Sequence, residues 1–174
     1  MIRRTFLAHG LMLLGFGRRI WAQLTTSERY ARLSSPVRIP LEAVRLPWRP
    51  VPFTGEAIAP RPGAGPGRRV LLSGVLFRRA TGDDRPELSA LCLTCTHEQC
   101  QVDFVAESTT LPRTDRAITR PVFLCACHSS VFDAAEDGAW IAGPAPRGLY
   151  RFRLTLRDAT VEINEVEEEA LSAV

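Results

Sequence analysis

Two short segments hold four of the five cysteines and two of the three histidines in this chain. Box one covers residues 95–100 and reads CTHEQC, and box two covers residues 125–133 and reads CACHSSVFD. Each box offers one thiolate and one imidazole a few positions apart, together with a second cysteine. Two such ligand pairs can hold either a tetrahedral zinc ion or a two-iron cluster in which one iron takes both cysteines and the other both histidines. The fold must therefore bring these two segments together.

In either case the ligands are the first cysteine and the histidine of each box: Cys95, His97, Cys125 and His128. A zinc site gives no role to the second cysteines, Cys100 and Cys127. In an exported protein these two can pair as a disulfide, because the compartment is oxidising. The bond would close a loop of about 28 residues and contribute roughly 3.6 kcal/mol on the chain-entropy model.

Length and composition fit one globular domain with a short additional segment. The chain has 174 residues, of which 45% are apolar and 24% charged, and a chain of this size can bury a core of its own. All 22 basic residues are arginine, and four of them lie in the first 22 residues, which contain no acidic residue. The rest of the chain carries 18 arginines against 19 acidic residues. This balance removes the electrostatic attraction that a nucleic-acid partner requires.

The first 22 residues have the pattern of an export signal. The motif Arg-Arg-x-Phe-Leu at residues 3–7 and a second arginine pair before Ala22 resemble a twin-arginine signal peptide, which exports folded proteins. The apolar run from Thr5 to Gly17 has 13 residues, whereas about 20 are needed to cross a bilayer. We expect a periplasmic protein. The alternative is an uncleaved N-terminal helix at the periplasmic face of the inner membrane, and membrane association is expected only through this segment.

Alternating apolar and polar residues, together with apolar runs, predict an all-β fold, a small antiparallel β-sandwich or barrel. The expected strands are Val37–Ile39, Val70–Arg78, Glu87–Leu93, Leu149–Leu156 and Thr160–Asn164, with the last two joined as a hairpin. Six prolines between Pro47 and Pro66 predict an irregular loop there. Between Cys95 and Pro146 the strand signal fades, so long loops are expected to carry the two boxes.

The expected organisation is a signal peptide at residues 1–22, a linker at 23–35, the β domain at 36–164 and an acidic tail at 165–174. The charge run Glu165–Ala170 is expected to be a solvated end. Cys92, the fifth cysteine, lies in an apolar strand and is expected to be a small buried hydrophobic residue.

The two boxes and a later proline-rich segment resemble a known family. The patterns Cys-Thr-His-x-x-Cys and Cys-x-Cys-His-x-Ser, followed by Gly-Pro-Ala-Pro-Arg at residues 143–147, are similar to the Rieske iron–sulfur proteins, in particular the disulfide-bearing branch of quinol-oxidising cytochrome bc complexes. The resemblance covers about Pro36 to Asn164. It implies a Rieske-type β fold, a loop-built cluster-binding part at about residues 92–147, and a 2Fe-2S cluster as cofactor.

The resemblance implies a role for each ligand candidate. Cys95 and Cys125 are expected to bind the buried iron and His97 and His128 the outer iron, while the other two box cysteines form the disulfide. Two neutral imidazoles in place of thiolates remove negative charge and raise the reduction potential to about −150 to +300 mV. The centre is therefore expected to exchange single electrons with quinol-like or similar donors.

Two residues of box two are expected to tune the potential. Ser130 matches the family serine that donates a hydrogen bond to a bridging sulfide, and Phe132 replaces the tyrosine of high-potential members. Because one hydroxyl donor is missing, we expect a potential below that of the quinol-oxidising complexes and above that of dioxygenase-type Rieske ferredoxins. A cover over the cluster is expected from Gly143, Pro144, Ala145 and Pro146.

Box one departs from the quinol-oxidising relatives, because Glu98-Gln99 stands where they carry Leu-Gly. Burying a charge in an apolar membrane dock is costly. The segment from Gln101 to Val122 is also longer than in the compact family pattern, and Ser108, Thr109 and Thr110 suggest an inserted surface loop.

We therefore expect a soluble periplasmic one-electron carrier or small redox subunit. Its partners would be redox proteins, such as a cytochrome, an oxidoreductase subunit or a quinol-oxidising complex. The sequence contains no visible catalytic nucleophile or general base, and an electron carrier needs none, since the chemistry belongs to the cofactor. Two alternatives stay open: a membrane-anchored iron–sulfur subunit of a quinol-oxidising cytochrome bc complex, and a non-redox zinc-binding or assembly module.

Overall fold

The structure, a computed structural model, describes residues 29–61, 63, 65–79, 87–106, 109–110 and 117–173. The expected signal peptide lies outside these residues. The elements within them are β1 (Tyr30–Pro40), η1 (Leu41–Val44), β2 (Val51–Ala59), β3 (Arg68–Arg78), β4 (Leu88–Cys92), β5 (Asp103–Val105), β6 (Thr109–Thr110), β7 (Ala117–Ile118), β8 (Val122–Cys125), β9 (Ser130–Asp133), β10 (Ala139–Ala142), β11 (Phe152–Arg157), β12 (Thr160–Glu167) and η2 (Glu168–Ser172).

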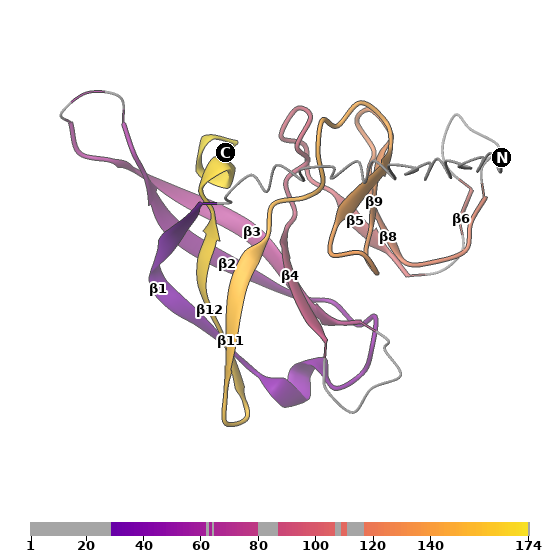
Figure 1. Ribbon diagram of the computed structural model, residues 1–174, viewed down its shortest axis with the longest axis horizontal. Coiled ribbons are helices and arrows are strands. Elements are labelled where there is room, and N and C mark those ends of the chain that lie inside the picture. Colours follow the sequence, from indigo (N-terminus) through magenta and orange to yellow (C-terminus); the bar gives the residue numbers. More distant parts are fainter. Residues whose placement is uncertain are drawn as a thin grey trace, which may run out of the picture.

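A six-stranded antiparallel sheet forms the larger part of the fold (Figure 1), in the order β11-β12-β1-β2-β3-β4. Its two edge strands approach each other, because Leu91 and Arg151 form an antiparallel bridge and the Cys92 amide donates to the Tyr150 carbonyl at 2.8 Å. The sheet is therefore curved into a nearly closed barrel. The prediction of an all-β antiparallel fold is confirmed.

The barrel core comes from the alternation of side chains along these strands. In β3, Val70, Leu72 and Leu76 are buried, and Val161 and Ile163 of β12 face the same core. Cys92 also lies there, fully buried, as predicted. Burial raises the pKa of the Cys92 thiol above its ordinary value, so this cysteine remains a neutral hydrophobic residue.

The predicted loop at residues 47–66 is wrong, because much of it forms β2. This strand pairs with β3 over its whole length, from Val51 opposite Leu76 to Ala59 opposite Arg68. On its other side it pairs with β1 only at Leu33 and Ala57. Because β2 is barely paired on the β1 side, few ladder hydrogen bonds are required at Pro52. A proline, which has no N–H to donate, is therefore tolerated there.

The acidic C-terminal segment also differs from the prediction of a solvated end. β12 continues to Glu167, which is 2% exposed, and Ala170 and Leu171 of η2 are buried in the barrel core. Burial alternates as far as Ile163, the register then shifts at Asn164, and the strand continues through the acidic residues. Their charges alone predict an exposed end.

A second, four-stranded antiparallel sheet with the order β10-β9-β8-β5 lies in the segment where long loops were expected. Figure 1 shows it beside the barrel, entered from β4 and left toward β11. Its strands have only three or four residues each, too few for a clear periodic signal. The suggested inserted loop contains a further two-stranded ribbon of β6 and β7.

A hydrophobic cluster joins the two sheets. Val75, Phe77 and Leu91 of the barrel pack in one cluster with Phe123 and Phe132 of the small sheet. The rings of Phe77 and Phe123 lie 5.8 Å apart between centroids. Because this cluster also includes Cys95 and Cys125, the small sheet and the ligand candidates are anchored to the barrel.

Candidate metal centre

The two boxes form loops of the same design. In box one the Gln99 amide donates to the Cys95 carbonyl at 3.1 Å, and in box two the Ser129 amide donates to the Cys125 carbonyl at 2.9 Å. Gln99 and Ser129 both adopt a left-handed backbone, with φ of 61° and 60°. Each loop thus turns tightly after its first cysteine, and its histidine lies within the turn. Cys127 also lies within its turn, whereas Cys100 follows the turn and its carbonyl accepts a hydrogen bond from the Cys95 amide at 2.8 Å.

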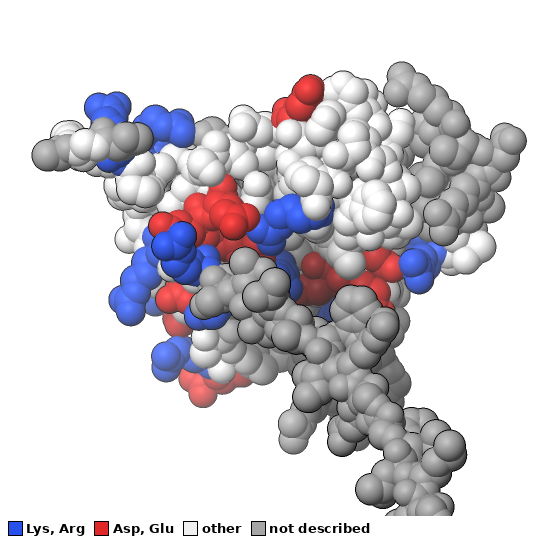
Figure 2. Space-filling model, turned by 45° about the horizontal axis from the view of Figure 1, so that its top comes forward, with Lys and Arg blue, Asp and Glu red and all other residues white. Residues whose placement is uncertain are grey.

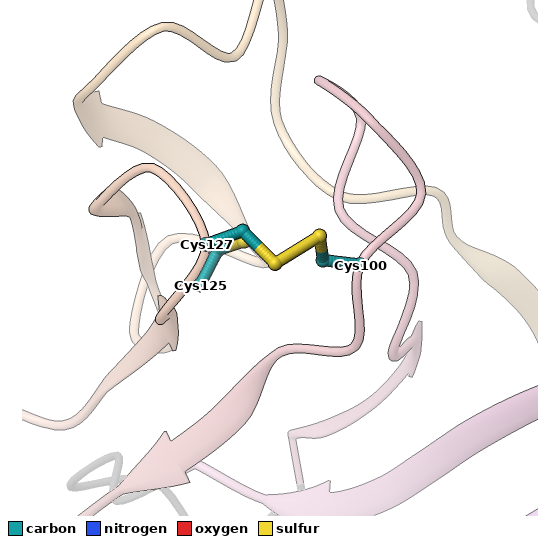
Figure 3. Close-up of side chains that lie close together, drawn as sticks. All are labelled: Cys100, Cys125 and Cys127. Carbon is teal, nitrogen blue, oxygen red and sulfur yellow. A yellow bond between two sulfur atoms is a disulfide. The ribbon is translucent and has the colours of Figure 1, made fainter.

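A disulfide joins these two loops. Cys100 and Cys127 are bonded, with their Cα atoms 6.6 Å apart, within the usual range for a disulfide. Figure 3 shows the bond between the two loops, with Cys125 beside it. The predicted pairing is confirmed.

The two remaining box cysteines form the buried side of the site. Cys95 and Cys125 are free thiols, each 1% exposed. Burial raises the pKa of the Cys95 thiol; a hydrogen bond from the backbone of His97 lowers it, and the neighbouring Cys125 thiol raises it further. A thiolate at Cys95 therefore requires a nearby cation, which a metal supplies.

The two histidines form the outer side of the site. The rings of His97 and His128 lie 4.8 Å apart between centroids and are nearly perpendicular, at 89°. The His128 side chain is 45% exposed, and its Nδ1 lies 3.8 Å from Glu98 Oε2. Among the described residues, His97 Nδ1 is buried and has no hydrogen-bond partner. A buried ring nitrogen without a partner is unfavourable unless a ligand or metal occupies its lone pair.

The donors thus fit an iron–sulfur centre, with two buried sulfurs on one side and two imidazoles on the other. Independently, the family model described as the Rieske [2Fe-2S] domain matches residues 67–153, half of the chain. The chain belongs to the Rieske family. No curated protein matches it. Its cofactor is accordingly a Rieske-type 2Fe-2S cluster, which supplies one-electron transfer when bound, and the cofactor prediction is confirmed.

The segment 143–147 packs against box two, and its expected role as a cover over the cluster stays a prediction. Ala145 is buried, and its amide donates to the Ser130 hydroxyl oxygen at 3.2 Å, whereas Pro144 and Pro146 are exposed. Ser130 is fully buried, and because its oxygen accepts this bond, its own proton remains available to another acceptor. The Ser130 side chain also forms a hydrogen bond that lowers the pKa of the Cys95 thiol. Its expected hydrogen bond to a bridging sulfide stays a prediction.

Phe132 is buried in the hydrophobic cluster that holds Cys95 and Cys125. We predict that Phe132→Tyr raises the midpoint potential, because a hydroxyl donor to a sulfur stabilises the more negative reduced cluster. Protein-film voltammetry of the holoprotein measures the shift. Phe123→Tyr is the matched control, since Phe123 lies opposite Phe132 in the ladder and is equally buried. An unchanged potential in Phe132→Tyr, or an equal change in the control, contradicts the prediction.

Sequence reasoning missed two contacts that hold the boxes. Asp133 is buried; it accepts a hydrogen bond from the Ala135 amide at 2.9 Å and pairs with Arg120 at 2.8 Å. Thr96, between two ligand candidates, donates to the Arg147 carbonyl at 2.9 Å. The only sequence signal that Asp133 and Thr96 hold the boxes in place was that both residues lie within the motifs.

Proposed function

We propose that the chain is a periplasmic one-electron carrier, or the small electron-transfer subunit of an oxidoreductase. The observation that carries this proposal is the polar, exposed tip: Glu98 and His128 are 62% and 45% exposed and lie next to each other. An exposed imidazole edge is a short exit for an electron, and a charged neighbour favours a hydrated, transient protein contact over a dry apolar dock.

Within this proposal, Cys95 and Cys125 bind the inner iron and His97 and His128 the outer iron. The support is the difference in burial between the two pairs, with both cysteines in the cluster that joins the sheets and His128 at the surface. The histidines then face the partner, which we expect to be another redox protein such as a cytochrome or an oxidoreductase subunit.

The surface near the site agrees with a transient partner. Figure 2 shows a largely uncharged face over the small sheet, with acidic atoms at its top, while most charges gather over the barrel. Docking a quinol-oxidising membrane subunit on this tip would desolvate the Glu98 carboxylate, which costs free energy unless a cation faces it. We therefore favour a protein partner that presents positive charge.

The proposed location rests on the N-terminal signal and on the disulfide. Disulfides persist in oxidising compartments such as the periplasm. Within the part of the chain that the structure describes, no helix is long and apolar enough to span a membrane. Both the signal and its cleavage after Ala22 remain predictions.

Purification from the native host under mild conditions tests this function. We expect a reddish-brown protein in the periplasmic fraction, with two irons and two labile sulfides per chain, a mature N-terminus at Gln23, and co-purification with a redox partner. Recovery in carbonate-washed membranes with an intact N-terminus would instead favour a membrane-anchored subunit of a cytochrome bc complex. A colourless protein containing zinc would refute the proposal.

We predict that Glu98→Gln raises the midpoint potential by roughly 40 mV or less, because a unit charge about 4 Å away in water contributes about 1 kcal/mol. Removing the negative charge favours the more negative reduced state. It should also weaken the salt dependence of electron transfer to a cationic partner. Glu56→Gln, on the barrel strand β2, is the control and should leave both quantities unchanged. A lower potential in Glu98→Gln would contradict the prediction.

A further inference from the structure

The C-terminal end of β12 contains a carboxylate that solvent hardly reaches. Glu167 is 2% exposed, and both of its oxygens are occupied. Oε1 accepts a hydrogen bond from Arg151 Nε at 2.7 Å, and Oε2 accepts one from the Arg147 guanidinium. The other terminal nitrogen of Arg147 donates to Glu169 of η2. A buried charge persists only when it is paired, so these groups determine one another's positions.

Arg147 belongs at the same time to residues 143–147, called here the covering segment after its expected role, which contacts both boxes. Its carbonyl accepts the hydrogen bond of Thr96 Oγ1 at 2.9 Å, and Thr96 stands between the ligand candidates Cys95 and His97. The guanidinium also lies over the Tyr150 ring, 5.0 Å from its centroid. One residue therefore connects the C-terminal segment, through its side chain, to box one, through its main chain.

We propose that Glu167 is a positioning residue for the iron–sulfur centre, acting through Arg147 to hold the 143–147 segment against both boxes. Much of this segment is exposed and none of it lies in a strand, so its position depends on such anchors. The acidic end of the chain is thereby part of the site's support. The inference rests on the proposed ligand assignment.

The decisive experiment compares Arg147→Gln with Arg151→Gln in the full-length holoprotein. Both variants remove one guanidinium from the same buried carboxylate, but only Arg147 is attached to the covering segment. Hydrogen exchange by mass spectrometry follows peptides that contain residues 95–100 and 143–147, and electron paramagnetic resonance of the reduced protein reports the cluster's surroundings. Global stability is measured in parallel for both variants.

We expect Arg147→Gln to accelerate exchange in both peptides about tenfold to a hundredfold, the range for loss of a charged hydrogen bond, and to shift the resonance g values. Arg151→Gln should lower global stability but leave both site readouts near wild type. Arg147→Lys, which keeps the charge and reaches one carboxylate at a time, should restore part of the protection. Glu167→Gln should reproduce the Arg147→Gln pattern.

Equal changes in Arg147→Gln and Arg151→Gln would overturn the inference, because they would show a purely structural ion pair. Wild-type exchange in Arg147→Gln would do the same. If Arg147→Gln does not accumulate as holoprotein, Glu167→Gln takes its place, and unchanged exchange and g values in that variant overturn the inference. If the wild type binds no iron, the ligand assignment fails. Exchange of the 95–100 and 143–147 peptides in the iron-free chain still decides whether Glu167, through Arg147, holds the 143–147 segment against both boxes.

Discussion

The double variant Cys100→Ala/Cys127→Ala is expected to lose roughly 3.6 kcal/mol of unfolding free energy, because the native bond closes a loop of about 28 residues. The bond joins two loops that are otherwise connected by a sheet of strands three to four residues long, by the hydrophobic cluster and by the 143–147 segment. Without it, the two halves of the ligand set separate more readily. We therefore also expect the variant to lose its visible absorption during purification.

Denaturant unfolding followed by circular dichroism gives the change in free energy, and the visible spectrum gives cluster retention. Cys92→Ala is the control, because it removes a cysteine that is buried in the barrel core and lies outside the boxes. It should keep the cluster and cost about 1 kcal/mol, as small core truncations do. A double variant with wild-type stability and colour would show that the bond has no structural role.

Gly143→Ala is expected to destabilise the fold by about 2–5 kcal/mol and to displace the covering segment. Gly143 has φ of +89°, and a left-handed non-glycine residue costs about 1–2 kcal/mol. A Cβ atom there would lie 2.5 Å from Ser130 Cα and 2.7 Å from the Ser129 carbonyl oxygen. These are backbone atoms of box two, so the overlap cannot be relieved by a side-chain rotation and adds about 1–3 kcal/mol.

Gly63→Ala separates the two contributions. Gly63 has a similar φ of +93°, but a Cβ atom added there would meet no other atom within 4 Å. This control should therefore show only the backbone cost and retain the cluster. The measurement is thermal unfolding together with the reduced-state resonance spectrum. Equal losses in the two variants would mean that the contact between Gly143 and box two is unimportant.

Much of the site could be predicted because its chemistry is local in sequence. The spacing of thiol and imidazole within each box already indicates a metal site. The two cysteines that this site leaves over are the two that form the disulfide in the structure. Among the strands, β3 is a long, largely apolar run and the hairpin of β11 and β12 shows alternation, and all three were predicted, β12 only as far as Asn164. Long periodic segments carry enough signal to be assigned from sequence.

The remaining parts depend on tertiary context. β2 contains Pro52, and only its sparse pairing with β1 makes this proline acceptable in a strand. The short strands of the small sheet exist because they pack on Phe77 and Leu91 of the barrel, which no local pattern reveals. Glu167 resembles a solvated acid until Arg147 and Arg151, about twenty residues earlier, are placed beside it.

The bridge between Leu91 and Arg151 brings together the two ends of the segment that carries the site. The chain leaves the barrel at β4 and returns at β11, and these two points are neighbours. The segment between β4 and β11 is therefore a cassette, an insertion whose two ends lie side by side on the barrel. Insertions are best tolerated in this arrangement. A short hairpin turn grafted from Cys92 to Tyr150 should therefore leave a closed, cofactor-free barrel, and donor cassettes of other lengths should be exchangeable at the same junction.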